Sequence, residues 1–88
     1  MTLVVTPDGY DPQHFSVKKD TPVRLVFRQL GYVSCGNELI FRWGKEQGAN
    51  IILASQSDSK VLEFIPEQAG DFQFNCPHLI YRGVMTVE

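Results

Sequence analysis

The chain alternates short runs of β-branched and aromatic residues with turn-forming residues, and this pattern constrains its fold more than any other feature. No stretch shows the period of a long amphipathic helix. Eight short strands separated by Pro, Gly, Asp and Ser are typical of a sandwich or barrel. We therefore predict an all-β fold, an antiparallel β-sandwich or barrel with Greek-key connections, with strands at residues 2–6, 15–19, 23–28, 38–42, 50–54, 60–65, 71–76 and 83–87.

The length of the chain leaves room for one hydrophobic core, so we expect residues 1–88 to form a single domain. No run approaches the roughly 20 apolar residues of a membrane-spanning helix, and the first residues lack the features of a signal peptide. The domain could still be part of a longer membrane-associated protein, on the cytoplasmic face or in the periplasm. The net charge of -2 and the scattered Lys and Arg residues argue against nucleic-acid binding, which needs a basic surface.

A thiol and an imidazole share the loop between the last two predicted strands, where one residue separates Cys76 from His78. Phe72, Phe74 and Cys76 alternate with polar residues, so the thiol of Cys76 is predicted to point inward. Cys35, the other cysteine, lies in a second turn-like stretch that a small β fold could bring alongside. Thiolate sulfur favours Cu(I), and imidazole binds copper in both oxidation states. We predict a copper site formed by Cys35, Cys76 and His78, with Cu(I) favoured.

No sequence feature points to catalysis. A Cys-His pair acts as a nucleophile only when a third group orients the base, and nothing in the sequence marks such a group. A phosphate-binding glycine motif, a nucleophile elbow and a Cys-x-x-Cys pair are all missing from the sequence. We therefore expect a binding protein rather than an enzyme, and we expect it to be monomeric.

The sequence resembles cupredoxin-like copper-binding domains. Residues 10–27 are similar to the opening strands of that family, and residues 63–66, 70–78 and 82–87 to its late strands and ligand loop; the resemblance is weakest over residues 43–59. The most similar subgroup contains cupredoxin-type Cu(I) chaperones and the cupredoxin-like domains of copper-exporting P-type ATPases. These pair an early Cys with a Cys-x-Met-x-Met loop. Cys35 and Cys76 match the two cysteines, whereas His78 and Ile80 stand at the two Met positions.

This resemblance implies a domain that binds and transfers Cu(I) in copper trafficking or export. Its partner would be a copper-transporting ATPase or another copper-transfer protein, to which it passes the ion by ligand exchange. Residues 77–81, around the ligand loop, are the expected docking surface for that partner.

Two alternatives remain open. Blue-copper electron carriers use an early His, then Cys, His and Met on one loop. In this chain Cys35 occupies the region of the early His, Tyr81 stands about where the Met is expected, and Met85 falls in the last predicted strand. The other alternative is a metal-free binding module stapled by a Cys35–Cys76 disulfide, such as an immunoglobulin-like domain with Trp43 packed on the bridge.

The sequence also gives expectations for four further side chains. Met85 alternates with Val87 and is predicted to lie in the core. His14 has no partner near it in the sequence and is expected to be a surface or structural residue. Asn37 and Glu38 follow Cys35 closely and could orient the ligand turn by hydrogen bonding.

Overall fold

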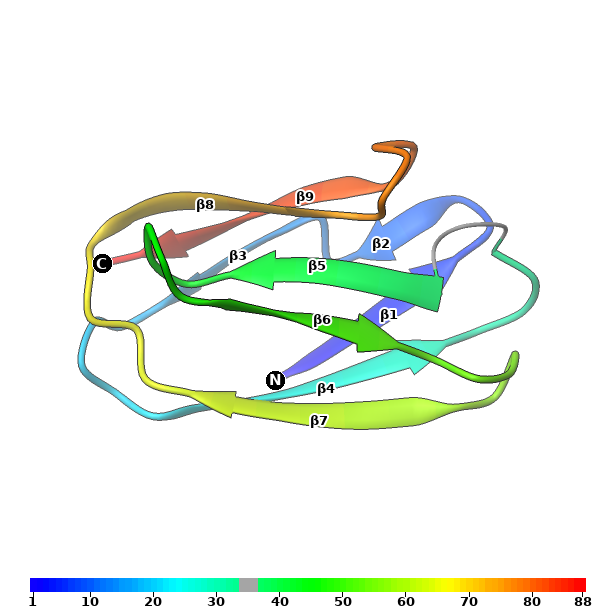
Figure 1. The fold of residues 1–88 in the computed structure, drawn as a ribbon, viewed down its shortest axis with the longest axis horizontal. Coiled ribbons are helices and arrows are strands. Elements are labelled where there is room, and N and C mark those ends of the chain that lie inside the picture. Colours follow the sequence, from blue (N-terminus) through cyan, green and yellow to red (C-terminus); the bar gives the residue numbers. More distant parts are fainter. Residues whose placement is uncertain (34–36) are drawn as a thin grey trace.

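Nine β-strands form in the part of the chain that the computed structural model describes, residues 1–33 and 37–88 (Figure 1). They are β1 (Thr2–Thr6), β2 (Gly9–Asp11), β3 (His14–Val17), β4 (Val23–Gln29), β5 (Glu38–Arg42), β6 (Gly48–Ile52), β7 (Ser59–Phe64), β8 (Gly70–Asn75) and β9 (Arg82–Val87). None of the described residues belongs to a helix that is long and apolar enough to span a membrane. The predicted all-β class is confirmed.

The strands form two sheets, with the orders β2-β1-β4-β7 and β3-β9-β8-β5-β6. The expectation of purely antiparallel pairing is wrong at two places, because β1 pairs with β4 and β3 pairs with β9 in parallel. The reason is that the chain leaves the first sheet after β2, forms β3 in the second sheet, and returns as β4 beside β1. Parallel neighbours require such a crossover, whereas a short hairpin always gives antiparallel strands.

The sequence pattern missed β2, because three residues are too few to show alternation. Pro7 and Asp8 alone form the turn, and Gly9 begins the strand opposite Thr6 in the β1–β2 pair. Gly9 has a φ of 126°, a backbone conformation that favours glycine. Strand β6 also differs from its prediction, since it covers Gly48–Ile52 rather than residues 50–54.

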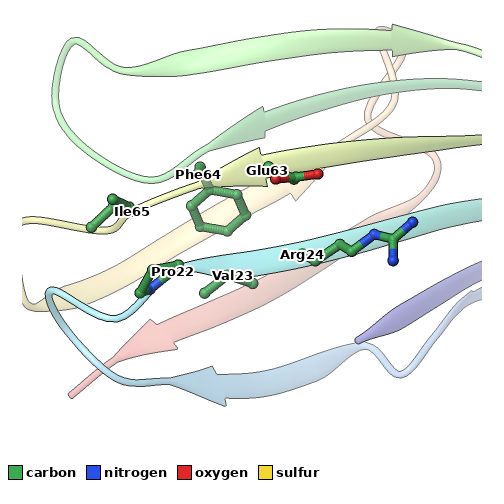
Figure 2. A pocket seen from close by; sticks show the side chains of 6 residues that line it. All are labelled: Pro22, Val23, Arg24, Glu63, Phe64 and Ile65. Atoms are coloured by element: carbon green, nitrogen blue, oxygen red, sulfur yellow. The ribbon is translucent and has the colours of Figure 1, made fainter.

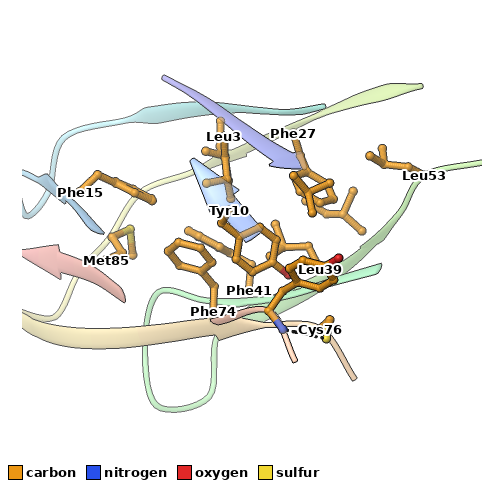
Figure 3. Close-up of a cluster of buried hydrophobic side chains, with 14 of the residues drawn as sticks. Leu3, Tyr10, Phe15, Phe27, Leu39, Phe41, Leu53, Phe74, Cys76 and Met85 are labelled. Atoms are coloured by element: carbon orange, nitrogen blue, oxygen red, sulfur yellow. Dashed lines mark hydrogen bonds between the residues drawn. The ribbon is translucent and has the colours of Figure 1, made fainter. Parts of the chain in front are cut away.

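An aromatic cluster fills the space between the sheets (Figure 3). The ring of Phe74 lies at its centre, with centroids 5.2 Å from Tyr10, 5.7 Å from Phe15 and 5.8 Å from Phe41. Phe74 and Cys76 are fully buried, so the predicted inward alternation of this strand is confirmed for both residues. Truncating a buried Phe to Ala typically costs about 3–5 kcal/mol, so this cluster is a major source of stability.

The loops divide between the two ends of the sandwich (Figure 1). One end carries the β1–β2 turn, the start of β5, the β6–β7 loop and the β8–β9 loop; the other carries the β3–β4, β5–β6 and β7–β8 loops and the C-terminus. Cys76 and His78 follow β8, so both belong to the first of these ends, which we call the thiol end.

Candidate metal centre

Cys76 is held in place by the backbone at both ends of its loop. Its N–H donates to the carbonyl oxygen of Tyr81 at 3.0 Å, and the N–H of Tyr81 donates to Cys76 Sγ at 3.4 Å. The carbonyl oxygen of Cys76 accepts from the N–H of Leu79 at 3.0 Å and from Asn75 Nδ2 at 2.7 Å. An N–H directed at sulfur stabilises a thiolate relative to a thiol, because it donates to the charged form. These hydrogen bonds hold the sulfur of Cys76 in one position.

The turn inside this loop is strained. Leu79 has a φ of 60°, in the left-handed region that residues other than Gly, Asn and Asp rarely adopt. Such residues persist only where the surroundings enforce them, and they concentrate at functional sites. Here the Leu79-to-Cys76 hydrogen bond closes the turn and enforces that conformation.

His78 lies on the same turn but faces solvent. Its side chain is exposed, and it forms no hydrogen bond or ion pair with any other described residue. The imidazole of His78 is therefore not held by the backbone of any described residue. The loop joins a fully buried thiol to an imidazole that solvent reaches.

Cys35, the remaining predicted ligand, lies outside the described residues. Beyond it, Asn37 exchanges two hydrogen bonds with Leu53: its carbonyl oxygen accepts from Leu53 N at 2.8 Å, and its Nδ2 donates to the Leu53 carbonyl at 3.3 Å. Strand β5 then begins at Glu38, and its residue Ile40 lies opposite Asn75 in β8. The chain therefore enters β5 beside the end of β8 from which Cys76 follows.

The side-chain amide of Asn37 bonds the backbone of Leu53, so its role in orienting the ligand turn stays a prediction. Within residues 1–33 and 37–88, no three Cys, His, Asp or Glu side chains come together closely enough to hold a metal ion.

Met85 is in the core, as predicted. It is fully buried in β9 opposite Phe72. Phe72 precedes Cys76 by four residues, which corresponds to about 13 Å along an extended strand. In Figure 3 the side chains of Met85 and Cys76 lie at opposite ends of the cluster. Met85 is therefore too far from the thiol to share a metal ion with it.

Tyr81 belongs to the buried cluster. Tyr81 is only 8% exposed, its hydroxyl donates to the Pro7 carbonyl at 3.5 Å, and its ring lies 5.9 Å from that of Tyr10. The expected docking surface at residues 77–81 is thus exposed only as far as Ile80.

Trp43 stacks on Phe64 with centroids 4.9 Å apart, at the end of the sandwich away from Cys76. This position does not fit an immunoglobulin-like tryptophan packed against the thiol.

The sequence did not reveal the partners of His14. Its Nε2 lies 2.8 Å from Thr86 Oγ1, whose hydroxyl donates to Asp71 Oδ1 at 2.7 Å. His14 is a surface residue as expected, but it has partners, which pairing of β3, β9 and β8 brings together from distant parts of the chain.

A pocket of about 330 Å³ lies away from the thiol end, where β4 begins and β7 ends (Figure 2). Its lining contains no thiol or imidazole and consists of Pro22, Val23, Arg24, Glu63, Phe64 and Ile65. It is therefore not a second candidate for a copper site.

Solved structures resemble this chain over its full length. The metal-binding domain of the Cu(I)-exporting P-type ATPase CopA of Streptococcus pneumoniae, determined with Cu(I), matches 100% of this chain and 83% of its own, with a TM-score of 0.85 and 25% identity. A copper-binding protein in its apo form matches 100% of this chain and 85% of its own, with a TM-score of 0.84 and 32% identity. Auracyanin from Roseiflexus castenholzii matches at a TM-score of 0.75 and 16% identity, covering 99% and 94% of the two chains.

The chain has a cupredoxin-like fold. No protein-family model and no curated protein matches the sequence. At 16% identity the auracyanin likeness concerns the fold alone, whereas the two copper-binding neighbours also share a quarter to a third of their residues with this cupredoxin-like domain.

Proposed function

We propose that this cupredoxin-like domain binds Cu(I) through Cys35, Cys76 and His78 and delivers it to a copper-transfer partner, such as a copper-transporting ATPase. The observation that carries the proposal is the loop of residues 76–81, which holds a fully buried thiol and an exposed imidazole on one hydrogen-bonded turn. The two solved structures that share 25% and 32% identity with the chain are copper-binding proteins, which supports a copper-related function.

The donor set suits Cu(I) as cargo. Two thiolates and one imidazole form a soft, low-coordinate set, which favours Cu(I) over harder cations. Cys76 would supply a sulfur that is shielded from oxidants, because it is fully buried and accepts the Tyr81 N–H. His78 would complete the site from the solvent side. A carrier of this kind catalyses no reaction.

Delivery requires that a partner's ligand approach the ion from outside. The solvent-facing His78 offers that approach, because an exposed imidazole can dissociate without disturbing the core. Leu79 and Ile80, next to it, are 51% and 67% exposed, and contiguous apolar surface of this kind marks protein contacts. We assign the docking of the partner to the exposed turn at residues 77–80.

Electron transfer is the less favoured alternative. The blue-copper set needs a weak axial ligand, usually Met, near the Cys. Met85 lies in the core about 13 Å along the sheet from Cys76, and Tyr81 turns its hydroxyl toward Pro7. Neither residue is positioned as an axial ligand.

An anaerobic Cu(I) competition titration against a colorimetric chelator tests the binding proposal. The reduced domain should bind one Cu(I), and both Cys35→Ser and Cys76→Ser should abolish competition. His78→Ala should bind more weakly, because the site falls from three ligands to two. His14→Ala, which removes a histidine from the outer face of the sheet, is the matched control and should bind like the unmodified domain. Competition that survives either serine substitution refutes the proposed site.

A transfer assay tests the docking surface. Leu79→Asp should slow delivery of Cu(I) to an acceptor protein while leaving affinity unchanged, because it alters the exposed turn and no ligand. Val61→Asp is the control, since Val61 is 48% exposed on β7, outside the thiol end. Equal transfer rates for the two variants would remove the docking assignment.

A further inference from the structure

Strand β6 lies at an open edge of its sheet. In the order β3-β9-β8-β5-β6, it pairs with β5 and has no other strand beside it among the described residues. An unpaired edge presents a row of backbone N–H and C=O groups that can pair with another chain.

The hydrogen bonds around the β5–β6 hairpin show which of these groups point outward. Trp43 N donates to Gln47 O at one end of the hairpin, and Leu53 N donates to Asn37 O at the other. In an antiparallel pair, residues alternate between those that bond the partner strand and those that face away from it. The odd-numbered positions of β6 therefore bond to β5, and Gly48, Asn50 and Ile52 direct their N–H and C=O groups away from the sheet.

The β6 edge lacks the features that usually prevent pairing. Edge strands are commonly protected by charged side chains, proline, or very short length. In the described part of the chain, β7 carries Lys60 and Glu63, β2 has three residues followed by Pro12, and β3 is followed by Lys18 and Lys19. Strand β6 reads Gly-Ala-Asn-Ile-Ile, with no charge and no proline, and Ile52 is 51% exposed.

We propose that β6 pairs with β6 of a second copy of this chain, antiparallel and centred on Asn50. In this register Asn50 faces Asn50 of the second copy, Gly48 faces Ile52, and Ala49 faces Ile51. Each large side chain thus lies opposite a small one, and the two central amides can hydrogen-bond to each other. The outward N–H and C=O groups of Gly48, Asn50 and Ile52 in one copy face those of Ile52, Asn50 and Gly48 in the other. Each of these three residue pairs is therefore of the hydrogen-bonded type.

The pairing joins the second sheets of the two copies into one continuous sheet. Because the strands are antiparallel, the thiol ends of the two copies face in opposite directions and both stay accessible. Strand β5 separates β6 from β8, which Cys76 and His78 follow, so the pairing uses no residue of the proposed copper site. It differs from the monomer expected from the sequence.

Analytical ultracentrifugation of the copper-free domain under reducing conditions tests the proposal. The weight-average mass should rise with concentration from the 10.0 kDa of one chain toward twice that value. A mass that stays at that of one chain up to millimolar concentration would overturn the proposal. Reducing agent excludes dimers joined through cysteine. The amides of Gly48, Asn50 and Ile52 should become protected from hydrogen exchange as the concentration rises.

A charge exchange at Asn50 tests the register. Asn50→Lys and Asn50→Asp should each be monomeric, because like charges face each other at the centre of the pairing, and an equimolar mixture of the two should form a heterodimer. Asn50 is exposed, so both variants should fold, and circular dichroism checks this. Val61→Lys, on the β7 edge, should associate like the unmodified chain. Self-association of Asn50→Lys at the unmodified level, or no association in the mixture, refutes the register.

Discussion

Substitution of Gly83 by Ala should destabilise the domain. Gly83 lies near the start of β9, which follows the loop of residues 76–81. Gly83 lies opposite Phe74 in the β8–β9 pair. A Cβ atom at this position would overlap the Phe74 ring and would lie 2.7 Å from the carbonyl oxygen of Gln13. The ring is enclosed by Tyr10, Phe15 and Phe41, so it has little room to move away.

The size of the effect follows from two opposing contributions. Forcing one extra carbon into a filled core costs about 1–3 kcal/mol, whereas replacing Gly by Ala gains about 0.4–1 kcal/mol by restricting the unfolded chain. We expect a net loss of about 1–2 kcal/mol, which lowers the melting temperature by roughly 4–16 °C in a domain of this size.

Thermal unfolding followed by circular dichroism measures this loss in two backgrounds. In Phe74→Leu, part of the ring that the added methyl group would overlap is gone, so Gly83→Ala should cost less there, with a coupling energy of about 1 kcal/mol. An unchanged melting temperature for Gly83→Ala, or the same loss of stability in both backgrounds, would refute the predicted overlap with the Phe74 ring.

Three further predictions concern the loops and the core. Leu79→Val should be less stable than Leu79→Asn by about 1 kcal/mol in urea unfolding, because Asn tolerates a positive φ and a β-branched residue does not; equal stabilities would argue against strain in this turn. The N–H of Ala54 first, and then that of Ser59, hold the pKa of Asp58 below its ordinary value of 3.8. A carboxyl group whose pKa is lower in the folded than in the unfolded state stabilises the fold when it is ionised. Asp58→Asn should therefore lower the free energy of unfolding at neutral pH, and the difference in this free energy from the unmodified domain should disappear as the pH falls below about 3.8. A difference that persists in acid contradicts this. Met85→Leu should change Cu(I) affinity less than twofold and stability by less than about 1.5 kcal/mol; a large loss of affinity would make Met85 a ligand after all.

The inward direction of Cys76 could be predicted because alternation is a local property of a strand. Phe72, Phe74 and Cys76 follow one another at every second position, and the buried positions of Phe74 and Cys76 agree with that period. The core position of Met85 followed from the same reasoning. Strand β2 could not be predicted in this way, because a three-residue strand contains too few positions to show a period.

The partners of the site residues could not be predicted, because they come from distant parts of the chain. The hydrogen bond from the Tyr81 hydroxyl to Pro7 links positions 74 residues apart, and that between His14 and Thr86 links positions 72 apart. No pattern within a short window of sequence carries information about such contacts. The sequence signals for the site were local to each residue: the one-residue spacing between Cys76 and His78, the inward alternation of Cys76 and the turn-like stretch that contains Cys35.

The sequence by itself determined the all-β fold class and identified the loop that carries a thiol, Cys76, and an imidazole, His78. These properties depend on residue type and on periods of two, which a linear chain displays directly. Only the tertiary structure decided which strands run parallel, that the imidazole of His78 faces solvent although it shares a turn with the buried thiol, and that β6 is left at an open edge. These properties depend on where the chain crosses between the sheets, and strand pairing between distant segments is set by the packing of the whole core.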